Sequence, residues 1–306
     1  MKSDLQPKSY KNEFGEISMK ANYLPLLLSV AALLSGSALA KDHSEESHEL
    51  SLHGINKQRI MLKENTLNKG FGPQSPRDID SKLGTNTIPF SPAPAASEMN
   101  LCNIHFHKNA EHKGGEFNKY AGDGDGHGYE SGYVYSGQLR ENELTETKYE
   151  VCPSKHGNLL PGDTIEVHYV HSSAQVSPGP TLGSCLSESI KNPQLRVETQ
   201  VYVLVNDANA LDFFDLTKHG EKSGKQQAFN IPTNTGIPVQ YAGSTTGPSY
   251  NEAGSPFQVS WSVRPKIAKV DINTVGAWCK SNVFNEDHAH GVRNLVINPD
   301  LLSPIE

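Results

Sequence analysis

The sequence predicts a mainly β fold, a single domain built on a large twisted antiparallel sheet with few short helices. From about residue 100 the chain is made of short alternating or apolar runs, rich in β-branched and aromatic residues and separated by Gly and Pro. The clearest runs are Asn100 to His107, Gly132 to Leu139, Thr164 to His171, Arg196 to Val205 and Phe257 to Pro265. No long amphipathic helix competes with them, so we expect an antiparallel β-rich domain.

The N-terminal stretch has the pattern of an export signal. Lys20 precedes an apolar run from Leu24 to Leu34, and small residues follow that run. We expect a signal peptide over residues 1–40, within which residues 1–18 are an over-called start if translation begins at Met19. The apolar run is too short to span a membrane, and no later segment is long and apolar enough. We therefore expect an exported soluble protein, either periplasmic or secreted.

Charge and cysteine content narrow the class of protein. The 306 residues carry a formal net charge of −7, which argues against nucleic acid as a partner. An even number of cysteines in an exported chain favours two disulfides, and four cysteines allow three pairings. None of them is spaced as C-x-x-C, so redox and zinc-thiolate interpretations are weak. The disulfide candidates are Cys102, Cys152, Cys185 and Cys279.

The segment between the signal and the β-rich part differs in character. Residues 41–97 are polar, contain several prolines and show little apolar periodicity, which predicts a mobile or surface-wrapping arm. We expect no catalytic role in this arm. Its histidines, His43, His48 and His53, are expected to be solvated and unligated. The catalytic domain is then expected over residues 98–306.

A pair of histidines is the first sign of chemistry. Successive side chains on a strand point to opposite faces, so Asn103, His105 and His107 share one face while Ile104 and Phe106 share the other. The two imidazoles then lie about 7 Å apart along the strand. Such a pair can bind one small cation.

A second strand can supply a third imidazole. In the run from Thr164 to His171, Glu166 and His168 share one face. Three neutral imidazoles leave the fourth tetrahedral position of Zn²⁺ open to water, which is the catalytic arrangement. Ligating histidines also need acceptors for their other ring N–H, and Asn103 and Glu166 each stand two residues before a predicted ligand. We therefore predict a zinc site formed by His105, His107 and His168.

Other candidate ligands are weaker. His171 faces away from His168 on a regular strand, so it is not counted as a ligand. His288 and His290 form a second H-x-H and are the best rival ligands. The Gly-Asp repeat that begins near Asp123 resembles the start of a calcium loop, but the twelfth position holds Val134 instead of Glu, which favours a flexible turn.

These residues together resemble a known family. Three segments follow one another like the ligand strands and threonine loop of α-type carbonic anhydrases: His105 to His107, Glu166 to His171, and Gly243 to Pro248 followed by Val259 to Trp261. Two longer runs are closer still to the δ-class, carbonic-anhydrase-like group: Asn103 to His112 and Glu286 to Arg293. The resemblance covers roughly residues 98 to 300. It implies an α-carbonic-anhydrase-like sheet and reversible hydration of CO2 to bicarbonate and a proton.

The resemblance also implies roles for individual residues. His105, His107 and His168 would bind zinc, whose charge brings the pKa of water down to about 7 and yields hydroxide to attack CO2. Thr245 resembles the threonine that aims this hydroxide, and Glu111 resembles the carboxylate that fixes the threonine hydroxyl. The remaining pocket assignments are Thr246 on the substrate side and an apolar wall of Val170 with Val201 or Val203.

Two other functions stay open, and so does the route of the proton. A cupin-type metalloenzyme would use Glu111 itself as a ligand and would match Gly162 before His168. A carbonic-anhydrase-like binding protein without catalysis is the other alternative, although that outcome usually follows the loss of a ligand histidine. The proton-shuttle candidates are His112, His171 and His290.

Overall fold

The structure, a computed structural model, describes residues 42–245 and 252–306. The predicted signal peptide at residues 1–40 and the predicted pocket residue Thr246 lie outside this range. From Asp42 to Glu306 the chain forms one compact unit. A helix long and apolar enough to cross a membrane does not occur in the described part of the chain.

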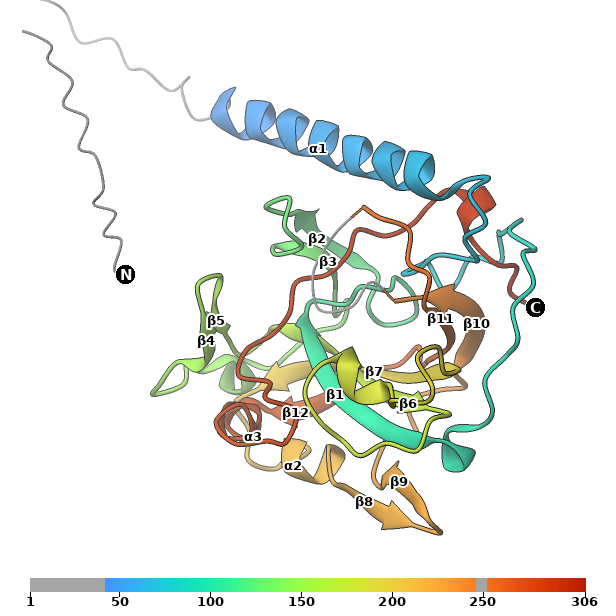
Figure 1. Ribbon diagram of the computed structural model, residues 1–306. Coiled ribbons are helices and arrows are strands. Elements are labelled where there is room, and N and C mark those ends of the chain that lie inside the picture. The colour runs from blue at the N-terminus through green and yellow to red at the C-terminus, as the bar shows by residue number, and fades with distance from the viewer. Residues whose placement is uncertain (1–41, 246–251) are drawn as a thin grey trace, which may run out of the picture. The chain divides into compact units, whose positions relative to one another are not determined.

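A six-stranded sheet forms the centre of the fold (Figure 1). Its strands run in the order β1-β6-β7-β11-β10, and β12 also pairs with β7. β-branched and aromatic residues dominate the strands β6 and β7 at the centre of the sheet, as expected for residues that pack on a pleated surface. The strands are β1 (Asn100–Lys108), β6 (Thr164–Ser172), β7 (Leu195–Val205), β10 (Val239–Ser244), β11 (Gln258–Val263) and β12 (Ala268–Asp271).

The prediction of a mainly β fold is confirmed, but the sheet is mixed instead of wholly antiparallel. The pairs β1–β6, β6–β7 and β10–β11 are antiparallel, whereas β11 and β12 both run parallel to β7. Parallel neighbours need a crossover connection. The chain between β7 and β11 provides one, which includes a short helix, a hairpin and β10.

Smaller elements surround the sheet. Three two-stranded hairpins lie outside it: β2 (Lys119–Asp123) with β3 (Ser131–Val134), β4 (Val151–Ser154) with β5 (Gly157–Leu159), and β8 (His219–Lys222) with β9 (Lys225–Ala228). The two short helices are α2 (Phe213–Leu216) and α3 (Ile272–Trp278). The 3-10 segments are η1 (Ala96–Glu98), η2 (Glu141–Leu144), η3 (Leu182–Cys185) and η4 (Pro299–Leu301).

The two faces of the sheet bury different residues. On one face, the apolar side chains of β1, β6 and β7 pack against α2 and α3, which lie side by side (Figure 1). On the other face, Val170 and Val201 pack against Trp261 of β11. All nine residues of β6 are buried, so its polar residues are enclosed as fully as its apolar ones. This second face carries the predicted ligands.

The prediction of two disulfides is confirmed, and the structure settles their pairing. Cys102 of β1 is bonded to Cys185 at the end of η3. Cys152 of β4 is bonded to Cys279, which follows α3. Such bonds persist in oxidising compartments.

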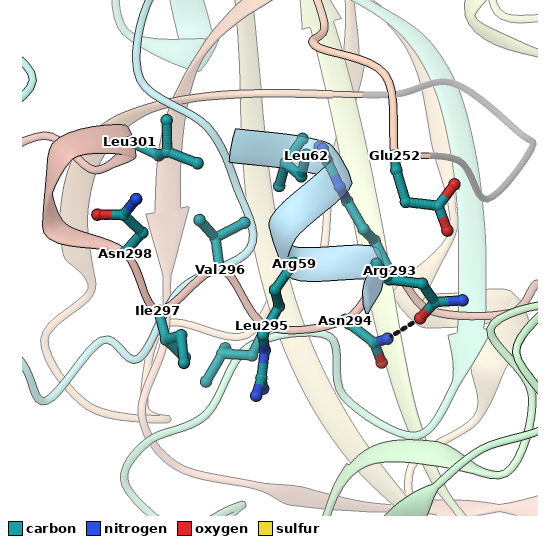
Figure 2. Close-up of a pocket in the computed structure, with 11 residues that line it drawn as sticks. Arg59, Leu62, Glu252, Arg293, Asn294, Leu295, Val296, Ile297, Asn298 and Leu301 are labelled. Atoms are coloured by element: carbon teal, nitrogen blue, oxygen red, sulfur yellow. Dashed lines mark hydrogen bonds between the residues drawn. The ribbon is translucent and has the colours of Figure 1, made fainter. Parts of the chain in front are cut away.

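The N-terminal arm differs from the loop-rich segment that the sequence suggested. Asp42–Thr66 form helix α1, and the first proline of the arm, Pro73, comes only after the helix has ended. The end of α1 is held by apolar contacts, since Leu62 packs in one cluster with Val296, Leu301 and Leu302. Figure 2 shows the pocket between α1 and this C-terminal segment. The arm is therefore packed against the domain.

Candidate metal centre

The pairing of β1 with β6 brings the three predicted histidines together. His105 lies directly opposite His168 in the register, and His107 lies opposite Glu166. Since side chains alternate along each strand, all four project from the same face. A bulge after Leu101 precedes the ligand stretch and leaves its register regular from Asn103 onward.

Hydrogen bonds fix which nitrogen of His105 carries the proton. Its Nδ1 lies 2.6 Å from Oδ1 of Asn103. The Asn103 amide cannot be turned around, because its Nδ2 donates to the carbonyl oxygen of Gly179 at 3.0 Å. Nδ1 of His105 is therefore the donor, and in the neutral ring Nε2 is left with a lone pair.

His168 is held in the opposite tautomer. Its Nε2 lies 2.7 Å from Oε1 of Glu166, and an ionised carboxylate can only accept hydrogen bonds. Although burial opposes ionisation, the neighbouring His112 and His168 hold the pKa of Glu166 well below its usual value. Nε2 of His168 is therefore the donor, which leaves Nδ1 as the nitrogen that can bind a metal.

His107 completes the set. Its Nδ1 donates to the carbonyl oxygen of Gly291 at 2.8 Å. Its Nε2 is buried and has no hydrogen-bond partner among the residues that the structure describes. A buried nitrogen without a partner is costly, so this atom needs a ligand from outside the chain.

The three imidazole rings of the triad lie close together, with centroids 4.8–5.2 Å apart. Nε2 of His105 and Nδ1 of His168 are 3.2 Å apart. Burial, reinforced by the neighbouring imidazoles, lowers the pKa of His105 well below its usual value, and burial lowers the pKa of His107 to about 4. Both rings are therefore neutral near pH 7, which is the form in which an imidazole binds a metal.

The spacing also fits a metal ion. One potential ligand atom from each of His105, His107 and His168 lies within 4.8 Å of the others. Two nitrogens at zinc distance in a tetrahedral site are roughly 3.3 Å apart, close to the separation of the His105 and His168 nitrogens. The cluster can thus hold a metal ion with little rearrangement.

A second group of close residues, His112, Glu166 and His168, is a support for the first. Nδ1 of His112 donates to Glu166 at 2.7 Å, and Nε2 of His112 lies 2.6 Å from the hydroxyl of Tyr241. The backbone N–H of His112 donates to the other Glu166 oxygen at 3.1 Å. Both nitrogens of His112 are occupied and its side chain is fully buried, so this group offers no open position to a metal.

A small cavity opens beside the triad. Its other walls come from segments far apart in the sequence, namely Ser75, Pro76, Glu111, Ser244, Thr245, Trp261 and Arg293. The Glu111 carboxylate accepts a hydrogen bond from the backbone N–H of Arg293 at 3.2 Å. It comes no closer than 3.8 Å to His107 and 3.9 Å to His168. Thr245 is the residue that directly follows β10.

Other predicted site residues lie outside this cavity. Val170 and Val201 pack in the core beneath it and do not line it. His171 is buried in another direction and bonded to the Tyr169 carbonyl, and burial lowers its pKa to about 4. His288 is paired with Asp287 at the surface.

The rival ligand His290 lies close to the triad without joining it. Its ring stacks on that of His105 with centroids 5.5 Å apart. Its Nε2 is 2.7 Å from Oε2 of Glu286, so this nitrogen already has a partner. The backbone of His290 bridges to β1, donating to the carbonyl of Phe106 and accepting from Lys108.

Several cavity residues were not anticipated from the sequence. Ser75 and Pro76 come from the arm, and Arg293 and the Gly291 carbonyl come from the C-terminal segment. The run from Glu286 to Arg293 was noted for its resemblance to a family, and this was a usable signal for its last residues. No local pattern marked Ser75.

A comparison with family models gives one match. The model described as Delta carbonic anhydrase matches residues 96–274, more than half of the chain, and this region includes the three histidines of the triad. A comparison with curated protein sequences finds no match.

Proposed function

Because this chain belongs to the delta carbonic anhydrase family, we propose that it catalyses the reversible hydration of CO2 to bicarbonate and a proton, with zinc as its metal. The observation that carries the proposal is the convergence of three imidazole rings, each of which has one nitrogen bonded to a fixed acceptor. This is the arrangement that ligating histidines adopt in zinc proteins.

The donor set matches a catalytic metal site. Three neutral imidazoles suit zinc and leave one tetrahedral position for a small ligand. When bound, zinc supplies the positive charge that ionises water near neutral pH, which makes hydroxide available to attack the carbon of CO2. The acceptors Asn103, Glu166 and the Gly291 carbonyl hold the three rings in the required tautomers.

Thr245 and Glu111 are proposed to orient the attacking oxygen. Both line the cavity beside the triad. In this arrangement the Thr245 hydroxyl accepts a hydrogen bond from the nucleophile and donates its own proton to Glu111. The nucleophile then keeps one lone pair aimed at the substrate. Because its orientation is fixed in advance, less entropy is lost on reaching the transition state.

The apolar side of the cavity is proposed to hold CO2. Val170 and Val201 do not line it, so we assign this role to Trp261 and Pro76, which do. The Trp261 ring stands edge-on to His168, with centroids 5.0 Å apart. An apolar surface beside the metal favours the nonpolar gas over water.

We also infer that the protein is exported and matures by cleavage after Ala40. The two disulfides and the apolar run in the first forty residues support this inference. N-terminal sequencing of the protein recovered outside the cytoplasm should begin at Lys41. Recovery of a reduced, uncleaved chain in the cytoplasm would contradict it.

The geometry disfavours the cupin alternative. That function needs Glu111 as a fourth ligand, but Glu111 approaches Nδ1 of His107 and Nε2 of His168, the nitrogens that already donate to acceptors. The non-catalytic alternative is disfavoured because all three histidines are present with free nitrogens.

A direct assay tests the proposed function. The oxidised mature protein is stripped with a chelator, reloaded with zinc, and assayed for CO2 hydration by stopped flow with a pH indicator. Activity should disappear with the metal and return on addition of about one zinc per chain. A zinc-replete, disulfide-bonded protein that is no faster than buffer would sink the proposal.

A further inference from the structure

Part of the N-terminal arm forms a wall of the cavity. Residues 72–77 are all buried, and two of them, Ser75 and Pro76, line the cavity beside the triad. This 72–77 segment lies outside the residues that the family model matches. Its position is unexpected for an arm whose sequence predicted no catalytic role, and its contacts show what it can do.

The Ser75 hydroxyl is bonded to the end of β10. The backbone N–H of Ser244 donates to Oγ of Ser75 at 2.8 Å. Ser244 is 1% exposed and Ser75 is 3% exposed, so water cannot replace this bond. Ser244 is the last residue of β10 and directly precedes Thr245. The hydroxyl therefore fixes the backbone from which Thr245 enters the cavity.

A chain of hydrogen bonds connects Ser75 to the predicted ligand His168. The Ser75 hydroxyl is hydrogen-bonded to Tyr241, whose own hydroxyl lies 2.6 Å from Nε2 of His112. Nδ1 of His112 lies 2.7 Å from Glu166, and Glu166 accepts from His168. A hydroxyl oxygen has two lone pairs, so the Ser75 oxygen can accept from the Ser244 amide in addition to its bond with Tyr241.

Gln74 supports the backbone of Thr245 through Ser255. Its Oε1 accepts from the N–H of Ser255 at 3.2 Å, and the Ser255 hydroxyl donates to the carbonyl of Thr245. The backbone N–H of Gln74 donates to Leu301 at 2.7 Å. Thr245 is therefore held from both sides by neighbouring residues of one segment.

The Ser75 carbonyl is bonded to Arg293, which also lines the cavity. It accepts a hydrogen bond from Nη1 of Arg293 at 3.2 Å. The backbone N–H of Arg293 donates in turn to Glu111, the proposed partner of the threonine hydroxyl. Ser75 thus contacts the supports of both Thr245 and Glu111.

The segment is itself rigidly anchored. The fully buried guanidinium of Arg77 donates to the carbonyls of Ser303, Ser81 and Leu83, and it lies 5.6 Å from the ring centroid of Tyr241. Outside the cavity, Asn65 of α1 donates to the carbonyl of Glu252 at 3.0 Å. Glu252 and Arg293 are among the residues that line the pocket shown in Figure 2. A rigid support can hold a reactive group to the accuracy that catalysis needs.

We propose that the 72–77 segment positions the Thr245 side of the cavity for CO2 hydration, with Ser75 and Gln74 as positioning residues. This inference rests on the proposed function. It makes the arm an integral part of the enzyme, so an intact segment is required for full turnover.

Two full-chain variants test the proposal in the zinc-loaded, disulfide-bonded protein. Ser75→Ala removes the acceptor of the Ser244 amide, and Gln74→Met removes the acceptor of the Ser255 amide with little change in shape. Each should keep about one zinc per chain, exchange the affected amide hydrogen faster, and lose kcat by roughly tenfold or more, because small misplacements of an orienting group are costly. The change in KM should be smaller than the change in kcat.

A control and a contrary result complete the test. Ser81→Ala removes a hydroxyl of the same arm that accepts only a long bond from Leu83 and lies away from the cavity, so kcat should not change. Faster exchange at Ser244 or Ser255 with wild-type kcat would overturn the proposal, since the contacts would then be structural only. Failure of the proposed function would be recognised separately, because the wild-type protein itself would then be inactive. The exchange rates of the Ser244 and Ser255 amides would still show whether Ser75 and Gln74 fix the backbone there.

Discussion

The two sides of the metal cavity are built in different ways. The ligand wall, His105, His107 and His168, comes from two adjacent strands whose register alone brings the imidazoles together. The opposing wall, Ser75, Pro76, Ser244, Thr245 and Arg293, comes from three segments that meet only in the folded protein. The first wall supplies lone pairs for a metal. The second supplies hydroxyl, carbonyl and guanidinium groups that face the reaction.

This difference predicts a division of labour. A change in the ligand wall should release the metal, because the three nitrogens are its proposed ligands. A change in the opposing wall should leave the metal bound and reduce turnover, because its groups are the ones proposed to orient the reacting oxygen. Metal content and kcat, measured on the same samples, therefore report on the two walls separately.

The largest effect is expected for His168→Ala. It removes one of three ligand nitrogens, so zinc should fall from about one per chain to near zero after dialysis, and CO2 hydration should be lost. His171→Ala is the matched control, since His171 lies on the same strand but faces away and bonds to Tyr169. Metal analysis by mass spectrometry decides the outcome. Full zinc content in His168→Ala with loss in a His290→Ala variant would assign the third ligand to His290.

Thr245→Ala should show the difference between the two walls most clearly, because kcat should change while zinc content does not. It keeps the triad intact, so zinc content should match the wild type, while kcat falls by about 100-fold if the hydroxyl orients the nucleophile. Stopped-flow hydration measures the rate, and Thr245→Ser serves as the control because it retains the hydroxyl. A Thr245→Ala variant with wild-type kcat would remove Thr245 from the mechanism.

The ligand wall could be predicted from sequence because its information is local. Alternation along a strand assigns Asn103, His105 and His107 to one face, and the same rule assigns Glu166 and His168. Only the pairing of the two strands had to be supplied by the fold. The hydrogen bonds from His105 to Asn103 and from His168 to Glu166 follow from spacings of two residues.

The opposing wall could not be predicted because no local rule connects its parts. Ser75 lies in a proline-containing stretch with no periodicity, and its partners are distant in the chain. The Gly291 carbonyl is a backbone atom, which no residue pattern identifies. The long helix α1 was missed for a related reason, since its burial depends on contacts such as Leu62 with Val296. Tertiary contacts decided all three features.

Glu166→Gln should weaken the ligand wall without destroying it. Glu166 accepts from His168, from the His112 ring and from the His112 backbone, and an amide has only one acceptor oxygen for these donors. Zinc affinity should fall by about 10- to 100-fold, as for other partners of ligating histidines. Competition with a chromogenic chelator measures it. The control Glu198→Gln changes a partly exposed carboxylate of β7 and should leave affinity unchanged. Equal affinities in the two variants would contradict a supporting role for Glu166.

The smallest effect is expected where the two walls touch. Trp261 stands edge-on to His168 and donates its indole N–H to the carbonyl of Ser244 at 3.2 Å. Trp261→Phe removes that bond and part of a buried ring, so zinc should be retained, the free energy of unfolding should fall by about 1–3 kcal/mol, and kcat should fall by less than about tenfold.

The second tryptophan of the chain provides the comparison for this last variant. Trp278 is equally buried but lies on the other face of the sheet, against Phe106 and Phe213. Trp278→Phe should therefore lower stability by a similar amount in urea unfolding while leaving kcat unchanged. If both variants lose stability and neither changes kcat, Trp261 serves only the core. In that case the opposing wall acts on the reaction through Thr245, supported by Ser75 and Gln74. The residues that hold CO2 would then have to be other than Trp261.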